Sequence, residues 1–287
     1  MKQILRYQIV WLLMVTMISC KDEPTPNILN EPNCRIAQLN QYETGVTVPY
    51  KELTFTYEGF LITRIDTKTR GVADGYRRIT YDKAKATTVT FYDKDNKLLT
   101  QYNFTYDANG WITSVDIHYA NYTPAIMGSY KYTYDNKGNI TKLSYYHNEK
   151  ITQVIEYTYK TGNNTEIIRS EIFDVSATDP TYKLKTGISE YVYDNKPSPN
   201  HWPAFTWSQN HQTQLDLLLP PSLHNLTNYT HYAPRSLGEE EPVFVVDESV
   251  SFTTNITYTE RNYPQSIVEK RANSQIRYDY SYVNCSK

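Results

Sequence analysis

The residues of this chain that could carry out acid–base chemistry recur as a tyrosine followed directly by an aspartate. Such pairs occur, for example, at Tyr92-Asp93, Tyr106-Asp107 and Tyr134-Asp135. Two carboxylates held side by side can serve as acid and base, as they do in glycoside hydrolysis. That use requires the aspartates to meet in a cleft that perturbs their pKa values. The residues that follow each pair indicate a structural role instead.

Four copies of the pattern end in a residue that tolerates a positive φ angle, whereas the copy at Tyr81 lacks one. The fourth residue after the leading tyrosine is glycine or asparagine, at Asn96, Gly110, Gly138 and Asn262. A type I turn that ends in a left-handed residue is a common connection between the two strands of a β-hairpin. An aspartate at the first turn position accepts backbone N–H groups. We therefore predict that the aspartates are turn residues and not catalytic groups.

The segments after the turns alternate in polarity. Val115 and Ile117 follow the turn at Gly110, and Leu143 and Tyr145 follow the next complete copy. A period of two is typical of a strand with one buried face, and strand–turn–strand units in series form an antiparallel meander. We expect an all-β fold with strands over residues 35–195 and 243–285. The hairpins should form a large curved sheet, or an open or closed barrel, with one short helical insert.

The composition supports strands and excludes some functions. The chain has 287 residues, with 28 tyrosines but only 8 phenylalanines. A tyrosine ring with its polar hydroxyl suits a half-buried sheet surface. The formal net charge is −2 without a basic block, so nucleic acid is not an expected partner. No GxSxG, Walker or HExxH motif occurs, so no catalytic residue, cofactor or metal site is predicted.

The N-terminus carries a targeting signal. Lys2 and Arg6 precede an apolar run over residues 9–18, which matches a signal-peptide core and is too short to span a bilayer. The run ends in Ser19-Cys20, which resembles a bacterial lipobox whose cysteine is lipidated. An ordinary secretory signal is the alternative. The expected organisation is a signal peptide at 1–19, a lipidated cysteine with a flexible tether at 20–33, and a single all-β domain at 34–287.

The lipobox is followed by Lys21, Asp22 and Glu23, which resemble a surface-export signal of Bacteroides-type lipoproteins; a merely polar linker is the alternative. With "TYDANG", "TYDNKG" and "YDNKPSPNHWPAF", this start is similar to the YD-repeat (RHS-like) lipoproteins of those bacteria. The resemblance implies an all-β outer-membrane lipoprotein, attached to the membrane through its N-terminal lipid and either surface-exposed or facing the periplasm. It implies no established activity.

Residues 196–242 interrupt the alternation. Leucines before Pro220-Pro221 predict one short helix there. We expect this segment to cover one end or face of the sheet and complete the core, with a functional loop as the alternative. In that alternative, ligand contacts would come from His201, Trp202, Trp207 and His211, for instance by stacking of the tryptophans on sugar rings.

Two cysteines remain if Cys20 carries the lipid. Cys34 lies just before the first predicted strand, and Cys285 lies just after the last one. The compartment outside the inner membrane is oxidising, and the chain ends of a domain are often close together. We predict a disulfide between them, with two unpaired thiols as the alternative.

Three functions are compatible with these features. The first is a non-enzymatic envelope lipoprotein that binds a glycan or a protein partner through a tyrosine-rich sheet surface. The second is a carrier of lipid or another apolar ligand inside the curved sheet. The third is a glycoside hydrolase, which requires two inward carboxylates at a fixed separation. An exposed aromatic strip would favour the first, an apolar interior the second, and a cleft with perturbed carboxylates the third.

Overall fold

The computed structural model describes residues 35–120, 127–160, 166–198, 224–236 and 242–283. These residues form seventeen strands and no helix. None of them belongs to a helix that is long and apolar enough to cross a membrane. The strands are β1 Arg35–Tyr42, β2 Lys51–Glu58, β3 Leu61–Thr69, β4 Val72–Asp82, β5 Lys85–Asp93, β6 Leu98–Tyr106, β7 Ile112–Tyr119, β8 Met127–Tyr134, β9 Ile140–His147, β10 Lys150–Tyr159, β11 Ile167–Val175, β12 Lys183–Pro197, β13 His224–Pro234, β14 Phe244–Val246, β15 Phe252–Tyr258, β16 Pro264–Lys270 and β17 Gln275–Val283.

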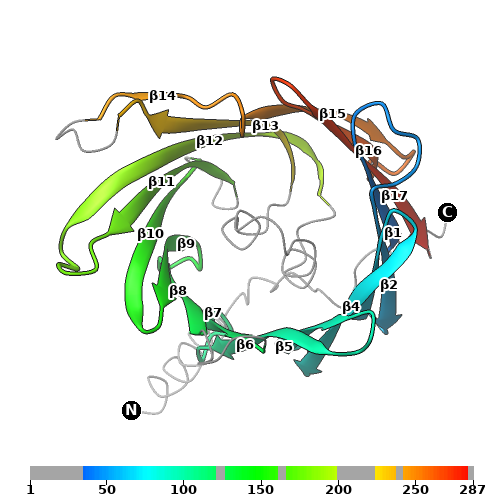
Figure 1. The fold of residues 1–287 in the computed structure, drawn as a ribbon, viewed down its shortest axis with the longest axis horizontal. Helices are drawn as coiled ribbons and strands as arrows, with labels where there is room; N and C mark the ends of the chain where they lie inside the picture. The colour runs from blue at the N-terminus through cyan, green and yellow to red at the C-terminus, as the bar shows by residue number, and fades with distance from the viewer. Residues whose placement is uncertain (1–34, 121–126, 161–165, 199–223, 237–241, 284–287) are drawn as a thin grey trace, which may run out of the picture. The chain divides into compact units, whose positions relative to one another are not determined.

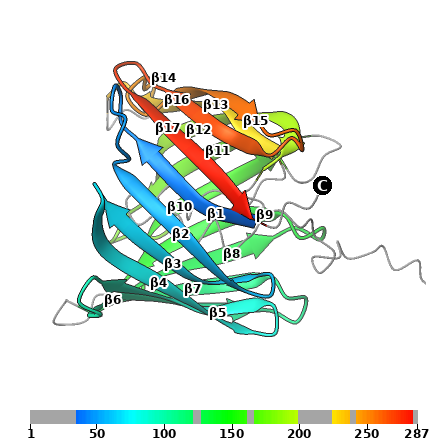
Figure 2. The same ribbon diagram turned by 90° about the vertical axis from the view of Figure 1, so that its right-hand side faces the viewer.

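The strands close into an antiparallel barrel (Figure 1). Each strand pairs with its neighbour in sequence, and β1 pairs with both β2 and β17. One edge of β13 pairs with the short β14 and then with β15, so sixteen strands complete the ring and β14 is an addition to it. Figure 2 shows β17 lying between β16 and β1 at the closure. The expected all-β meander is confirmed, in its closed form.

The sheet buries one face, and closure makes that face the interior. In β6, Tyr102 and Phe104 are buried, whereas Gln101, Asn103 and Thr105 alternate with them and are not. The same alternation runs around the ring and produces one continuous core from β1 to β17. Ile65, Val89 and Val115 in its wall are 0% exposed. The barrel therefore has an apolar interior and a polar outer wall.

The turns have the geometry expected from the sequence. The φ angles are 63° at Asn96, 88° at Gly110, 87° at Gly138 and 64° at Asn262. In the turn at Gly138, its N–H donates to the Asp135 carbonyl at 3.3 Å, and the Asp135 Oδ1 atom accepts the N–H groups of Lys137 at 2.8 Å and Asn139 at 2.9 Å. The aspartate is fully engaged in the turn, as its place in the pattern predicts.

The leading tyrosine of the pattern has a second role, which joins one hairpin to the one before it. Its hydroxyl donates to a backbone carbonyl 18 to 22 residues earlier, at the start of the preceding strand, over 2.6 to 3.1 Å. We call these bonds the tyrosine latches. They run from Tyr57 to Ile36, Tyr81 to Ile62, Tyr106 to Ala86, Tyr134 to Ile112, Tyr159 to Ile140 and Tyr282 to Pro264.

One expectation about the interrupting segment is not tested, and another changes. The residues of the predicted helix before Pro220-Pro221 lie outside the described residues. Residues 224–234, which the sequence analysis placed within the insert at 196–242, instead form strand β13. The pairing of β12 with β13 shifts register after Val192 and again after Tyr193. Each shift interrupts the period of two, which conceals this strand from a search for simple alternation.

Candidate functional site

The latch pattern breaks where β12, β13 and β15 meet. Within the described residues, six tyrosines of the pattern form a latch. Tyr92 on β5, Tyr193 on β12 and Tyr258 on β15 form none. The Tyr258 hydroxyl donates to the Asp194 carboxylate instead of a backbone carbonyl. Because repeats follow local rules, a departure from them marks the first place to search for function.

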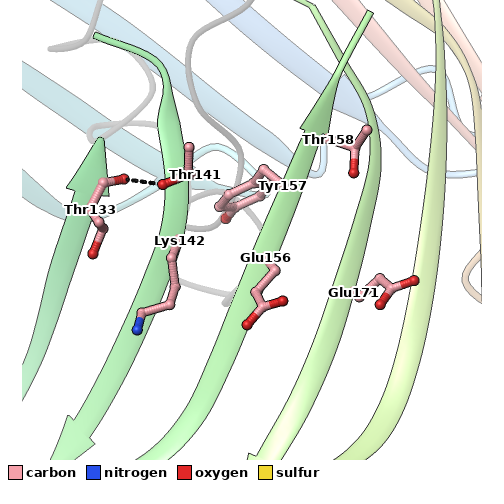
Figure 3. A pocket seen from close by; sticks show the side chains of 7 residues that line it. All are labelled: Thr133, Thr141, Lys142, Glu156, Tyr157, Thr158 and Glu171. Atoms are coloured by element: carbon pink, nitrogen blue, oxygen red, sulfur yellow. Dashed lines mark hydrogen bonds between the residues drawn. The ribbon is translucent and has the colours of Figure 1, made fainter. Parts of the chain in front are cut away.

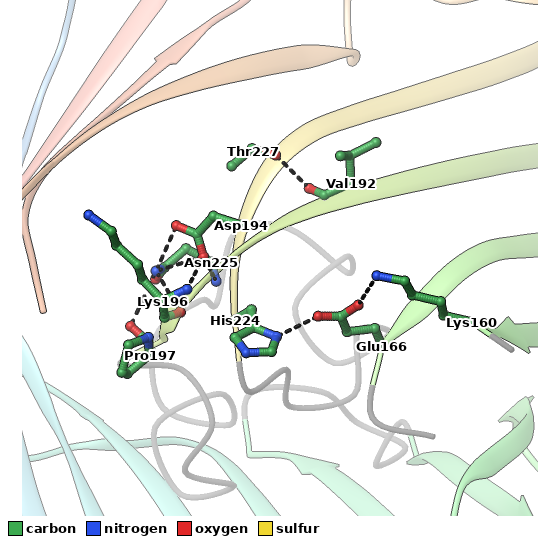
Figure 4. Close-up of polar contacts among 9 residues, drawn as sticks. All are labelled: Lys160, Glu166, Val192, Asp194, Lys196, Pro197, His224, Asn225 and Thr227. Atoms are coloured by element: carbon green, nitrogen blue, oxygen red, sulfur yellow. Dashed lines mark hydrogen bonds and ion pairs between the residues drawn. The ribbon is translucent and has the colours of Figure 1, made fainter. Parts of the chain in front are cut away.

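Asp194 is the centre of this departure (Figure 4). Its Oδ1 atom accepts the N–H groups of Lys196 at 2.9 Å and Asn225 at 3.1 Å, and its Oδ2 atom accepts the Asn225 side-chain amide at 3.2 Å. The Lys196 ammonium lies 3.8 Å from the centroid of the Tyr258 ring. A carboxylate that accepts this many hydrogen bonds is held in a fixed position between the strands.

A second buried carboxylate, Glu166, lies between two cationic or titratable side chains in Figure 4. Glu166 is 4% exposed, accepts the Lys160 ammonium at 3.3 Å and contacts the Nδ1 atom of His224. His224 is paired in register with Pro197. The two carboxylate clusters therefore fix the ends of β12 and β13, between which residues 199–223 run. No nucleophile is hydrogen-bonded to Glu166 in the part of the chain that the structure describes.

A serine and a histidine also meet inside the barrel. The Ser189 hydroxyl lies 3.0 Å from the His231 Nδ1 atom and 3.1 Å from the Tyr229 hydroxyl. Burial lowers the pKa of His231, against the opposing effect of the nearby Asp247 carboxylate. However, the Asp247 carboxylate accepts hydrogen bonds from the N–H and the hydroxyl of Ser249, and Ser189 is 1% exposed. Three groups of a catalytic triad are near one another, but the nucleophile is sealed from substrate, so this is a buried polar network.

The outer wall contains a pair of carboxylates in a groove of about 400 Å³ over β8 to β11 (Figure 3). Glu156 and Glu171 lie directly opposite each other on adjacent strands. The Lys185 ammonium, 2.7 Å from Glu171, lowers the pKa of that carboxyl together with Arg169. A glycosidase acid needs a raised pKa to hold its proton. The lowered pKa of Glu171 is the opposite of what a proton donor in a glycoside hydrolase requires.

The inner tyrosines have the electrostatics of a buried structural layer. Burial raises the pKa of Tyr57 and Tyr106 to about 12 each. Burial also raises the pKa of Tyr134, Tyr159 and Tyr282, which make the same kind of latch. A raised pKa keeps each hydroxyl protonated as a hydrogen-bond donor at neutral pH. These side chains are thus suited to holding the hairpins together and not to acid–base catalysis.

Most of the site residues predicted from sequence fall outside the described residues. These are Cys20, Lys21, Asp22, Glu23, Cys34, Cys285, His201, Trp202, Trp207 and His211. Arg35 and Val283, which are close in sequence to Cys34 and Cys285, lie directly opposite each other in the β1–β17 pairing. The sequence analysis did not single out Asp194, Asn225 or Tyr258 as a group. The sequence pointed only to the "YD" at 193–194. The proximity of residues 225 and 258 to this pair could not be predicted, because it is set by the strand pairing in the barrel.

Several solved structures are similar in fold. A porin-like protein from Bacteroides uniformis is 12% identical, with 86% of this chain and 97% of that chain covered and a TM-score of 0.49. A porin-like protein from Bacteroides vulgatus is 11% identical over 86% and 98% of the two chains, with a TM-score of 0.37. A protein of unknown function from Bacteroides fragilis is 11% identical over 60% and 86%, with a TM-score of 0.23.

Comparisons at the level of sequence give no match. No model of a protein family matches this chain, and no curated protein does. The similarity to YD-repeat lipoproteins therefore stays an expectation from the motifs, whereas the hairpin and its turn are features of the structure.

Proposed function

We propose that this chain is a non-enzymatic protein of the cell envelope that holds an apolar or amphipathic ligand in the interior of its barrel. The observation that carries this proposal is the polarity of the wall. Most inward positions are apolar or tyrosine, with buried polar exceptions such as Arg77, Thr100 and Ser189. The buried core includes Ile117, Leu143 and Tyr280. Sixteen strands enclose more space than the side chains of a small barrel fill. An apolar lining with tyrosine hydroxyls at its edge suits a ligand with an apolar body.

The outer wall supports a location in water for the barrel. A wall that faces lipid carries an apolar band, and the interior of a water-filled channel is polar. Here the arrangement is reversed, with Glu52, Thr54 and Thr56 alternating outward along β2. Ion pairs also lie on this wall, including Arg277–Asp279 at 3.2 Å. Attachment to the outer membrane would then come from lipid on Cys20, as the sequence predicts, and not from the strands.

The same polarity bears on the expectation of a glycan or protein partner on a tyrosine-rich surface. Most of the tyrosines that lead the repeats, among them Tyr57, Tyr81 and Tyr106, pack against the buried core. They do not form the exposed aromatic strip that this mode of binding requires. The tyrosine-rich face thus favours the carrier over a glycan binder that uses this face.

The proposal can be tested by contact quenching of tryptophan fluorescence, with one tryptophan placed on each side of the same strand. Tyr119→Trp places a reporter on the inner face of β7, and His118→Trp places one on the outer face one residue away. A bromine-labelled fatty acid should quench the Tyr119→Trp signal and leave the His118→Trp signal unchanged. Native mass spectrometry of purified residues 21–287 should show a bound lipid. Equal quenching of both reporters, or none, together with a ligand-free mass would contradict the proposal.

A further inference from the structure

A second groove, of about 760 Å³, crosses the outer wall over β2, β3 and β4. Its volume is in the range of sites that hold small organic ligands. Hydroxyl groups and three cationic side chains line it, with one carboxylate, Glu58. The polar lining residues are Thr56, Thr63, Thr80, Arg64, Arg78 and Lys83.

The charges of this groove break a rule of sheet pairing. Arg64 and Arg78 lie directly opposite each other on β3 and β4, and like charges in this arrangement destabilise a sheet. Arg64 is compensated, because its guanidinium lies 2.6 Å from the Asp66 carboxylate. Within the described ranges, Arg78 is exposed and has no carboxylate at ion-pair distance. Its charge is therefore available to a ligand.

Stacked aromatic rings fix the arginines beside the groove. The rings of Tyr76 and Tyr92 stack at 4.8 Å with an interplanar angle of 18°. The Arg64 guanidinium lies 3.8 Å from the Tyr76 centroid, and that of Arg78 lies 6.0 Å from the Tyr92 centroid. Because β3 and β5 flank β4, Arg64 and Tyr92 approach Tyr76 from opposite sides. The ring faces of Tyr76 are occupied, so this surface offers cations and hydroxyls to a ligand and not a stacking platform.

The groove over β8 to β11 shows what a balanced surface looks like on the same wall. There Lys142 lies directly opposite Glu156 (Figure 3). Glu171 pairs with Lys185. Glu156 and Glu171 also lie opposite each other, but each of these carboxylates has a cation beside it. The unbalanced cations are thus a property of the β2–β4 groove and not of the outer wall in general.

We infer that the β2–β4 groove binds an acidic glycan, with Arg78 and Lys83 receiving its carboxylate or sulfate groups. A guanidinium binds planar anionic groups through two parallel hydrogen bonds. The threonine hydroxyls beside it match the hydroxyl groups of a sugar. The length of the groove over three strands suits an oligosaccharide better than an isolated anion. This site is on the opposite face of the wall from the interior ligand and does not depend on it.

Isothermal titration calorimetry with the galacturonic acid trimer tests the site, and the fully methyl-esterified trimer is the uncharged control. The acidic trimer should bind to purified residues 21–287, and the esterified trimer should bind at least about tenfold more weakly, as expected when a charge-assisted hydrogen bond is lost. Arg78→Gln should weaken binding by a similar factor, and Arg78→Lys should weaken it less. Lys142→Gln, in the balanced groove, should leave the affinity unchanged.

Thermal unfolding of the same variants separates binding from folding. Because Arg78 faces Arg64, Arg78→Gln should unfold at the wild-type temperature or above it. Equal binding of the two trimers, unchanged affinity in Arg78→Gln, or displacement of the trimer by an equal concentration of sulfate would overturn the inference. A lower unfolding temperature for Arg78→Gln would also overturn it, because Arg78 would then be a structural residue. Fatty-acid quenching in Tyr119→Trp should be the same with or without Arg78→Gln.

Discussion

The Tyr134 hydroxyl donates to the backbone carbonyl of Ile112 over 2.7 Å, which joins the end of β8 to the start of β7. The acceptor belongs to the preceding repeat, so this bond connects two units and not two ends of one hairpin. Five further tyrosines repeat the arrangement around the barrel. In the copies at Tyr106 and Tyr134, the tyrosine holds the unit to its neighbour and the aspartate shapes the turn.

Loss of one latch should have a measurable cost. Tyr134→Phe removes the hydroxyl and leaves the Ile112 carbonyl without that donor, and we expect a loss of about 0.5–1.5 kcal/mol in the free energy of unfolding. Tyr146→Phe is the control, because Tyr146 lies on the outer side of β9, where the Lys131 ammonium is 4.5 Å from its ring centroid. Urea unfolding measures both. A cost for Tyr146→Phe as large as that for Tyr134→Phe would contradict the latch.

High pH should unfold the protein through its inner tyrosines. The pKa of Tyr57 is raised by burial from 10.0 in the unfolded reference to about 12 in the fold. The folded state therefore binds more protons than the unfolded state in this range, and stability falls as pH rises. The contribution is fully present below pH 10 and is lost between pH 10 and about 12. Circular dichroism and tyrosinate absorbance, followed together, should change in one cooperative step above pH 10. Gradual ionisation with an intact fold would contradict this.

Two glycines with positive φ angles, Gly138 and Gly59, allow the effect of backbone strain on stability to be compared with the effect of a side-chain clash. Gly138 has φ 87°, and a Cβ atom there would lie 2.9 Å from Trp111. Gly59 has φ 57° and open space around the same position. Gly138→Ala should therefore cost more stability than Gly59→Ala, and Gly138→Val should cost at least about 1 kcal/mol more than Asp135→Ala. Thermal denaturation of the four variants decides it, and equal costs for the two alanine variants would show that Trp111 moves away freely.

The closure of the barrel makes the predicted disulfide testable. Arg35 and Val283 are paired in register, and Cys34 and Cys285 lie one and two residues beyond them in sequence. We expect the purified, unreduced mature protein to contain no free thiol once Cys20 is lipidated. Reduction should lower its stability by up to about 5 kcal/mol in the chain-entropy model. A count of two free thiols would reject the bond, and Cys34→Ser should then leave stability unchanged.

Lipidation has a direct test. Cys20→Ala should abolish acylation and release the protein from membranes, because no other attachment to lipid is predicted. Mass spectrometry of the mature N-terminus and membrane fractionation measure the two effects. In a second variant, replacement of Lys21, Asp22 and Glu23 by alanine should reduce protease accessibility on intact cells without a change in acylation. A Cys20→Ala protein that stays in the membrane fraction would show that the wall itself, or another group, holds it there.

The amino-acid sequence determined the local structure because local structure depends on neighbours along the chain. A left-handed residue four places after a tyrosine, with aspartate between them, specifies the hairpin at Gly138 without reference to the rest of the protein. Alternation along β6 and β7 likewise follows from period two. Where bulges shift the register, as between β12 and β13, the alternation fails and the strand at 224–234 is not predicted.

Only the tertiary structure decided which face of the sheet points into the barrel and which residues from different hairpins come into contact. The pairing of β1 with β17 closes the ring and turns a tyrosine-rich sheet surface into an interior. The register of β12, β13 and β15 brings Tyr258 to Asp194, 64 residues away, and the register of β3 and β4 sets Arg64 against Arg78 on the outer wall. Such contacts depend on strand register and on closure, which are properties of the whole barrel. A pattern of local turns can specify each hairpin, but it contains no information on the direction in which the assembled sheet curves.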